Sequence, residues 1–134
     1  METSGEVATG RRRESKRRSD CPVACALDLV GDRWTLLIIR DLLAGKSRFA
    51  EFLSSPEGIP SNILADRLKR LEAAAVVRRV PYSLHPPRDA YQLTEKGQDL
   101  GRAVDALAEW GLRQFPGTVR SIASRGGSES TSPG

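Results

Sequence analysis

The segment of residues 60–77, with the sequence PSNILADRLKRLEAAAVV, most constrains how this chain can fold. Four of its apolar residues recur at the spacing of one helix face, which predicts a stripe packed against a core. These residues are Leu64, Leu68, Leu71 and Ala75. Ser61 is the expected N-cap, because its hydroxyl can accept a hydrogen bond from a free backbone N–H. The opposite face is polar and basic, which suits either water alone or a charged partner.

Three helices are expected before this segment. Asp20 can cap a helix that begins at Cys21, and Gly31 ends that helix. Residues 33–43 are dense in Leu and Ile, which predicts the most buried helix of the fold. Residues 47–53 predict a short helix, which the Pro and Gly of the following SSPEGIP sequence end.

A hairpin and a last helix are expected after the segment. Residues 76–82 and 90–93 are rich in Val and Tyr and predict two strands. The turn SLHPPRD joins them, and Pro87 is expected to block regular pairing at its tip. Thr94 is expected to cap a final amphipathic helix that continues to Pro116.

The order of these elements is that of a winged helix-turn-helix. Such a fold places one helix in the major groove of DNA and a ribbon on the adjacent backbone or minor groove. The expected fold class is therefore mainly α with a small β-hairpin wing. A winged helix that binds a protein in place of DNA stays open as an alternative.

The distribution of charge supports a polyanionic partner more than the total charge does. The formal net charge is +4. Residues 21–116 carry 13 Lys and Arg against 12 Asp and Glu, so this part is almost neutral. Residues 60–91 carry six basic and three acidic side chains, and RRRESKRR at residues 11–18 carries six basic and one acidic. A local basic patch on the amphipathic helix and hairpin is therefore expected to face nucleic acid.

Length and composition predict one domain with two tails. Residues 1–20 are expected to form a disordered basic tail, which either adds non-specific attraction to DNA or is simply solvated. Residues 21–116 form the domain, and residues 117–134 form a second disordered tail. No apolar run reaches the ~18 residues of a membrane span. No signal peptide is recognisable either, so a cytoplasmic, nucleoid-associated protein is expected.

The sequence gives little support for an enzyme. It contains one His, so a multi-histidine metal site is excluded, and it has no Gly-rich phosphate loop. Cys21 and Cys25 are spaced C-x-x-x-C, whereas a thiol redox enzyme needs C-x-x-C. No catalytic residue, metal or cofactor is therefore expected.

Six short motifs follow one another between Cys21 and Gly111. They are CPV, GDRWTLLIIRDL, RFAEFL, GIPSNILADRLKRLE, YSLHPPRDAYQLTEKG and ALAEWG. Together they resemble the HxlR family of transcriptional regulators, which are relatives of the MarR type. The resemblance implies a homodimeric winged-helix repressor or activator, with repression favoured, that dimerises through its first and last helices. A symmetric dimer is expected to bind a palindromic operator in double-stranded DNA.

One residue departs from the family pattern. The family usually has Gly where Ala75 stands. Gly allows a left-handed helix end that Ala adopts only at a cost of about 1 kcal/mol. The helix is therefore expected to run further before the wing, or to end differently.

The expected contacts fall on two surfaces. Asn62 is the best base reader, because its amide can pair bidentately with adenine. Arg88 follows two prolines and is expected to contact the minor groove or a phosphate. The full DNA-binding set is Ser61, Asn62, Ile63, Asp66, Lys69, Arg70, Arg78 and Arg88. By resemblance, the dimer interface contains Leu27, Leu100, Val104, Leu107 and Trp110.

Several other residues in these segments are expected to have mainly structural roles. Arg67 lies beside the apolar stripe, so an ion pair is as reasonable as a DNA contact. Arg78 and Arg79 adjoin in a strand, so only one of them can face DNA. Tyr82 and Tyr91 are expected to brace the wing.

Cys21 lies at a helix start, where the helix dipole favours a reactive thiolate. Some HxlR-type regulators resemble this arrangement, using an N-terminal cysteine to sense oxidants or electrophiles. Cys21 is therefore either a redox switch acting on the dimer or a packed side chain. Cys25 either resolves the oxidation product or fills a small buried space. Regulation by an oxidant or by a small-molecule effector is kept as an alternative.

Overall fold

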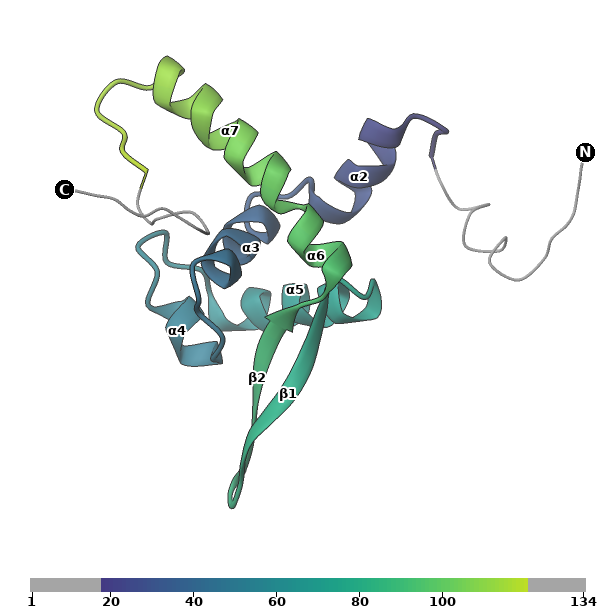
Figure 1. Ribbon diagram of the computed structural model, residues 1–134, viewed down its shortest axis with the longest axis vertical. Helices are drawn as coiled ribbons and strands as arrows, with labels where there is room; N and C mark the ends of the chain where they lie inside the picture. Colours follow the sequence, from purple (N-terminus) through teal and green to yellow (C-terminus); the bar gives the residue numbers. More distant parts are fainter. Residues whose placement is uncertain (1–17, 121–134) are drawn as a thin grey trace, which may run out of the picture. The chain divides into compact units, whose positions relative to one another are not determined.

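A computed structural model describes residues 18–120 of the protein (Figure 1). These residues fall into two units that divide between Asp32 and Arg33. The first unit contains α2 (Pro22–Val30). The second contains α3 (Thr35–Leu43), α4 (Phe49–Leu53), α5 (Ser61–Ala73), β1 (Val77–Leu84), β2 (Pro87–Leu93), α6 (Glu95–Asp99) and α7 (Gly101–Gln114).

The described part is mainly helical with one two-stranded antiparallel hairpin, which confirms the predicted fold class. The predicted tails at residues 1–20 and 117–134 lie almost wholly outside the described residues. Within residues 18–120, no helix combines the length and the apolar character that a membrane span needs.

The start of α2 differs from the prediction. Cys21 is the N-cap residue, with an extended backbone at φ −72° and ψ 125°, and it precedes the first helical turn. Asp20 was expected to cap the helix, but no side chain does so. The N–H of Cys21 instead donates to Ser19 Oγ at 2.9 Å. The helix ends at Gly31, as predicted.

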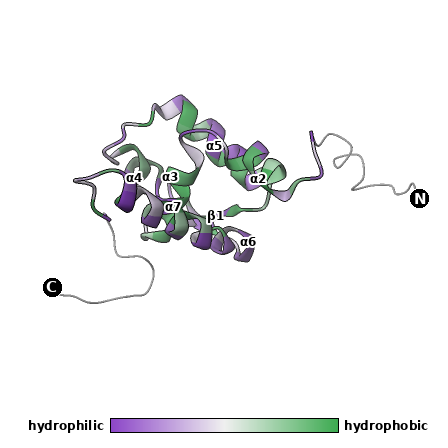
Figure 2. Ribbon diagram, turned by 90° about the horizontal axis from the view of Figure 1, so that it is seen from above, coloured by the Kyte–Doolittle hydropathy of each residue, from purple (hydrophilic) through white to green (hydrophobic). Residues whose placement is uncertain are grey.

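The core of the second unit forms around α3 and the apolar stripe of α5. Helix α3 packs against α7 and β2, and α5 packs against α4 and β1. Figure 2 shows that α3 is largely hydrophobic, whereas α6 is hydrophilic. The buried apolar residues of this unit are Ile38, Ile39, Leu42, Phe52, Ile59, Leu64, Leu68, Leu71, Val76 and Val77. The three leucines of α5 are at most 1% exposed. Burying each contributes about 1.5–3 kcal/mol, so this stripe fixes which face of α5 remains outside.

Both ends of α5 differ from the sequence prediction. Pro60, not Ser61, is the N-cap, because its extended backbone places its carbonyl to accept the Leu64 N–H at 2.9 Å. At the other end, Ala75 adopts a left-handed backbone with φ 62°. The helix therefore does not run further, and Ala75 is exposed and outside the buried stripe.

The end of α5 is a complete Schellman motif, in which two backbone N–H groups reach back to carbonyls of the last turn. The N–H of Val76 donates to the Leu71 carbonyl at 2.9 Å, and the N–H of Ala75 donates to the Glu72 carbonyl at 3.0 Å. Val76 and Leu71 are both buried, which provides the apolar contact that usually accompanies this motif. Ala75 thus adopts a left-handed conformation that Gly would adopt without strain.

The hairpin is longer than predicted and projects away from the helices of its unit (Figure 1). Pro87 pairs with Leu84, so the prediction that it blocks pairing is wrong. Pro87 is the first residue of β2, a position where the missing N–H is tolerated. The register is irregular between Pro81 and Ser83, which leaves Tyr82 outside the paired positions.

The predicted final helix is divided into α6 and α7, which meet at Leu100. Thr94 caps α6 as predicted, because its Oγ accepts the Gly97 N–H at 3.2 Å. Gly97 is buried, and a Cβ there would clash with the carbonyl of Val76. Glycine therefore lets α6 lie directly against the end of α5.

Candidate nucleic-acid interface

The exposed face of α5 follows from its buried leucines. Because these leucines point into the core, the residues on the other side of the helix face outward. Ser61, Asn62, Asp66, Lys69 and Arg70 are exposed, and Ile63 is half-buried. One helix thus brings together six of the eight residues predicted to bind DNA. The other two, Arg78 and Arg88, lie on the hairpin.

Ion pairs identify cations whose charge is already balanced. Arg67 contacts Asp66 at 2.5 Å, so a carboxylate predicted to meet DNA is engaged by its neighbour. Arg79 lies 3.3 Å from Glu72 and 3.7 Å from Asp89. These carboxylates, Glu72 foremost, raise the pKa of Arg79. Such exposed pairs are individually weak, but they compete with phosphate for the same guanidinium groups.

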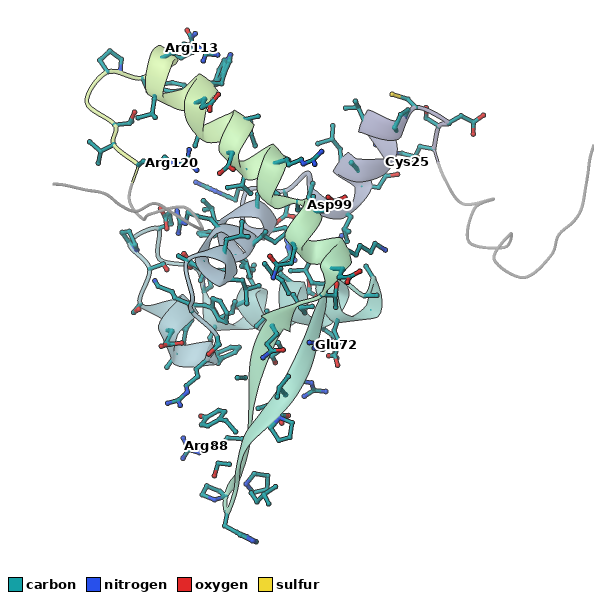
Figure 3. The ribbon with its side chains drawn as sticks, viewed as in Figure 1. Cys25, Glu72, Arg88, Asp99, Arg113 and Arg120 are labelled. Atoms are coloured by element: carbon teal, nitrogen blue, oxygen red, sulfur yellow. The ribbon has the colours of Figure 1, made fainter. Side chains whose placement is uncertain are left out.

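Other cations keep an unbalanced charge. Within residues 18–120, Lys69 and Arg88 form no ion pair. Arg78 donates from Nη2 and Nε to Oε1 of Gln92 at 3.1 and 3.3 Å, which orients the guanidinium without cancelling its charge. Arg78 is therefore a better candidate for phosphate than Arg79. Figure 3 shows Arg88 on the hairpin.

A polar network holds the turn that precedes α5. Asp41 is buried on α3, and its Oδ2 accepts from Ser55 Oγ at 2.6 Å. Lys46 donates to the same hydroxyl oxygen at 2.7 Å. Arg40 bridges Asp41 and Glu57, each at 2.9 Å. Its hydrogen bonds to Glu57 lower the pKa of that carboxyl and raise the pKa of Arg40 itself.

This network ties α3 to the turn between α4 and α5, because Ser55 and Glu57 belong to that turn. A buried carboxylate is stable only when its oxygens are hydrogen-bonded, and both oxygens of Asp41 are. The network therefore fixes where α5 begins. Its members are scattered in the sequence, so no local motif reveals it.

Two side chains of the α6 region hold the other end of α5. Thr94 Oγ donates to the Ala75 carbonyl at 2.6 Å, and Lys96 Nζ donates to the Ala74 carbonyl at 2.7 Å. These bonds satisfy carbonyls that the end of a helix leaves without partners. The exposed face of α5 is thus positioned by contacts at both ends of the helix.

The hairpin is tied to the start of α4. The N–H of Tyr91 donates to the Ser47 carbonyl at 2.7 Å, and the Tyr91 ring meets Phe52 edge-on at 6.4 Å between centroids. The guanidinium carbon of Arg48 lies 4.1 Å from the ring centroid of Tyr82. Both tyrosines therefore brace the hairpin, as predicted. Arg48 belongs to the RFAEFL motif, but no local pattern predicts its contact with that ring, because only the fold brings the two together.

The last helix exposes large apolar side chains. On α7, Leu107 is 53% exposed and Trp110 is 51% exposed, and they lie about one turn apart. Leu100 and Val104 are half-buried on the same stretch. In the first unit, Leu27 is also exposed. Exposed apolar side chains of this size on one helix, such as Leu107 and Trp110 on α7, commonly mark a protein interface.

Both cysteines are free thiols. Cys21 is exposed, which argues against the alternative that it is a packed side chain. Cys25 is half-buried, and its Sγ donates to the Ser19 carbonyl at 3.3 Å. It is therefore not the fully buried small side chain that one alternative expected.

Comparison with known proteins identifies relatives along most of the chain. The HxlR-like helix-turn-helix family matches residues 29–118. An HTH-type transcriptional regulator of Mycobacterium tuberculosis is 46% identical over 94 residues. The matched region is 70% of this chain and 59% of that relative, so the chain spans less than two thirds of the relative's length.

Solved structures of transcriptional regulators are also similar to this chain over most of its length. PA1607, described as a candidate transcription factor, is 36% identical with a TM-score of 0.73, covering 88% of this chain and 84% of that one. The redox regulator HypR in its reduced form is 34% identical with a TM-score of 0.66, covering 72% of this chain and 95% of that one. The winged helix-turn-helix, the motif order and these similarities agree: the chain belongs to the HxlR-like helix-turn-helix family of transcriptional regulators.

Proposed function

We propose that this regulator binds operator DNA as a homodimer, with α5 in the major groove and the hairpin on the adjacent backbone or minor groove. One observation carries the proposal: an exposed polar face of α5, fixed by three buried leucines, is accompanied by Lys69 and Arg88, which form no ion pair within residues 18–120. Helix α5 has 13 residues and is therefore about 20 Å long. With its side chains an α-helix is about 10–12 Å in diameter, so a major groove about 12 Å wide admits it.

The residues of α5 have distinct roles in this proposal. Ser61 and Asn62, at the N-terminal end, reach base edges, and Asn62 pairs with adenine. Ile63 offers an apolar contact to a thymine methyl group, and Lys69 and Arg70 meet phosphates. Asp66 contacts a base only if it leaves Arg67, so it ranks below Asn62 as a base reader.

The hairpin supplies the flanking contacts. Arg88 meets the minor groove or a phosphate, and Arg78 meets a phosphate from the base of the hairpin. Because phosphate contacts carry no sequence information directly, these residues add affinity and register, while Asn62 adds sequence preference.

Dimerisation is proposed through the apolar residues Leu100, Val104, Leu107 and Trp110, together with Leu27. The exposure of Leu107 and Trp110 supports this, since burying such side chains is favourable by about 25 cal/mol per Å². A two-fold dimer presents two copies of α5, so the operator is a palindrome. We favour repression, in which the bound dimer occupies promoter DNA.

Oxidation of Cys21 is proposed as one control of DNA binding. Its exposure at the start of α2 supports this, as does the similarity to a redox regulator. In a disulfide between two subunits, two Cys21 thiols lose two electrons and two protons to the oxidant as the Sγ–Sγ bond forms. The test compares the parent and Cys21→Ser with and without diamide, which accepts those electrons and protons. If diamide did not change DNA binding by the parent, regulation by oxidation of Cys21 would be excluded.

A gel-shift experiment tests DNA binding itself. The probe is duplex DNA from the region upstream of the protein's own gene, with a scrambled duplex of equal length as control. The parent is expected to shift the upstream duplex at lower concentration than the scrambled one. Lys69→Gln and Arg88→Gln are expected to weaken both shifts, because they remove phosphate contacts. Equal binding of parent and variants would contradict the proposed docking.

A further inference from the structure

Arg48 is an exposed cation at the junction between α4 and the hairpin, and it lies outside the set of residues proposed to bind DNA. It is the N-cap residue of α4, and its guanidinium lies over the ring of Tyr82 on β1. The neighbouring main-chain bond from Tyr91 to Ser47 ties β2 to the same turn. Arg48 is therefore attached to the helix-turn-helix by its backbone and to the hairpin by its side chain.

The positive charge of Arg48 is not balanced by an ion pair in the described part of the chain. The nearby carboxylate of Glu51 is used by the backbone: its Oε1 accepts the N–H of Ser47 at 2.8 Å and that of Arg48 at 2.9 Å. These two backbone bonds are the main reason that the pKa of Glu51 lies below its usual value. The guanidinium itself is therefore held by an aromatic ring and not by an anion.

An aromatic ring holds an arginine in a way that suits anion binding. The ring attracts the cation through its quadrupole, so the side chain is oriented while its net charge remains. The N–H donors in the guanidinium plane stay available, and their fork matches the geometry of a phosphate. By contrast, Arg40, Arg67 and Arg79 are all paired with carboxylates.

We propose that Arg48, positioned by Tyr82, binds a DNA backbone phosphate between the contacts of α5 and those of the hairpin. This inference rests on the proposed function. Helix α4 packs on α5, and Tyr82 lies on the strand that leads to the hairpin tip. Arg48 thus joins the two proposed contact regions into one continuous surface, and Tyr82 acts as a positioning residue.

The salt dependence of binding tests the phosphate contact. The probe is a fluorescent duplex of mixed sequence, because phosphate contacts do not depend on sequence. Each lost contact lowers the slope of log Kobs against log salt by about 0.9, so Arg48→Gln is expected to lower it by about 1.8 per dimer. At about 0.1 M salt this corresponds to roughly an eightfold loss of affinity per contact. Arg48→Lys is expected to keep the slope and lose part of the affinity, because Lys lacks the planar fork.

A matched control removes the same charge elsewhere. Arg113 lies at the far end of α7 from Arg88 and the hairpin (Figure 3). Arg113→Gln is expected to keep the parent's slope, with sedimentation confirming an unchanged oligomeric state. If Arg113→Gln lowered the slope as much as Arg48→Gln, the effect would reflect net charge alone and the proposal would be overturned.

Variants of Tyr82 test its positioning role. Tyr82→Phe keeps the ring and is expected to bind like the parent. Tyr82→Leu keeps apolar bulk without the ring, and is expected to weaken binding about two- to fivefold. In the Arg48→Gln background, Tyr82→Leu is expected to have no further effect. If Tyr82 acted only in packing, Tyr82→Leu would weaken binding equally in both backgrounds. That result would overturn the positioning role.

Failure of this inference is distinguishable from failure of the proposed function. If Arg48→Gln matched the parent in affinity and slope while Arg88→Gln did not, the Arg48 contact would be rejected and DNA binding would stand. If the parent showed no salt-dependent binding to any duplex, the proposed function would fail and the Arg48 contact with it.

Discussion

Ala75 occupies the left-handed region at the end of α5, and replacing it with glycine should make the protein more stable. Its φ is 62°, a conformation in which the Cβ of an L-residue approaches the following carbonyl too closely. Its side chain is exposed, so removing the methyl group loses little apolar burial. The backbone bonds of Ala75 to Glu72 and Thr94 do not involve the methyl group and should persist.

The expected gain follows from two opposing terms. A non-glycine residue in this region costs about 1–2 kcal/mol relative to its ordinary conformation. Glycine removes that strain but has more freedom in the unfolded chain, which reduces the gain by about 0.5–1 kcal/mol. The net increase in the free energy of unfolding should be about 1 kcal/mol. For a domain of this size that raises Tm by about 4–8 °C.

Urea unfolding followed by tryptophan fluorescence measures the change, at one fixed protein concentration for all variants. Ala75→Gly should raise the midpoint without changing the slope m, since the buried surface is the same. Ala74→Gly is the matched control, because Ala74 has φ −87° and gains nothing from glycine. It should lose about 0.5–1 kcal/mol. If both variants were destabilised alike, residue 75 would not be left-handed and the described end of α5 would be incorrect.

Three further predictions follow from other parts of the structure. Asn62→Ala should relax preference at one base position by about 1–3 kcal/mol, measured by competition among operator variants; unchanged preference would exclude Asn62 as a base reader. Trp110→Asp should give monomers by sedimentation, whereas a stable dimer would place the interface elsewhere. Arg40 lowers the pKa of Glu57, so the pair stabilises the fold above that carboxyl's ordinary pKa of 4.5 and this contribution is lost as pH falls. The stability of the parent should therefore exceed that of Glu57→Gln at neutral pH, and the difference should shrink on acidification; a constant difference would contradict the pairing.

The periodic part of the fold was predictable from the sequence. Leu64, Leu68 and Leu71 reveal both the helix and its buried face, because a stripe of leucines at helical spacing has few other uses. The polar residues between them were then placed outward without a structure. The Val- and Tyr-rich segments after residue 76 predicted the hairpin, and Thr94 predicted the start of the last helix.

Positions governed by backbone geometry and close packing were harder to predict. Ala75 is left-handed because the buried partner Val76 and the bonds from Thr94 and Lys96 outweigh a local strain of about 1–2 kcal/mol. Pro87 pairs in the sheet because it begins its strand, a boundary that the sequence placed three residues later. Such outcomes depend on tertiary contacts that propensity does not contain.

The sequence predicted that Tyr82 and Tyr91 brace the hairpin, but it did not predict which distant residues they contact. Arg48 and Tyr82 are far apart in sequence, and only the fold places the guanidinium over the ring. The same holds for the network of Asp41, Ser55 and Glu57. These contacts position the candidate interface. The sequence therefore predicted an outward-facing set of residues for DNA and a few supports, such as Thr94 and the two tyrosines, but not the partners that hold the interface in place.

The most direct test of the central claim is a hydroxyl-radical footprint of the protein on the DNA upstream of its own gene. The account predicts two protected half-sites related by two-fold symmetry, with centres about 10 bp apart or slightly more. Protection should disappear in a variant that carries both Asn62→Ala and Lys69→Gln. Protection of a single half-site by the parent, or none at any concentration, would contradict a dimer that presents two copies of α5 to successive major grooves.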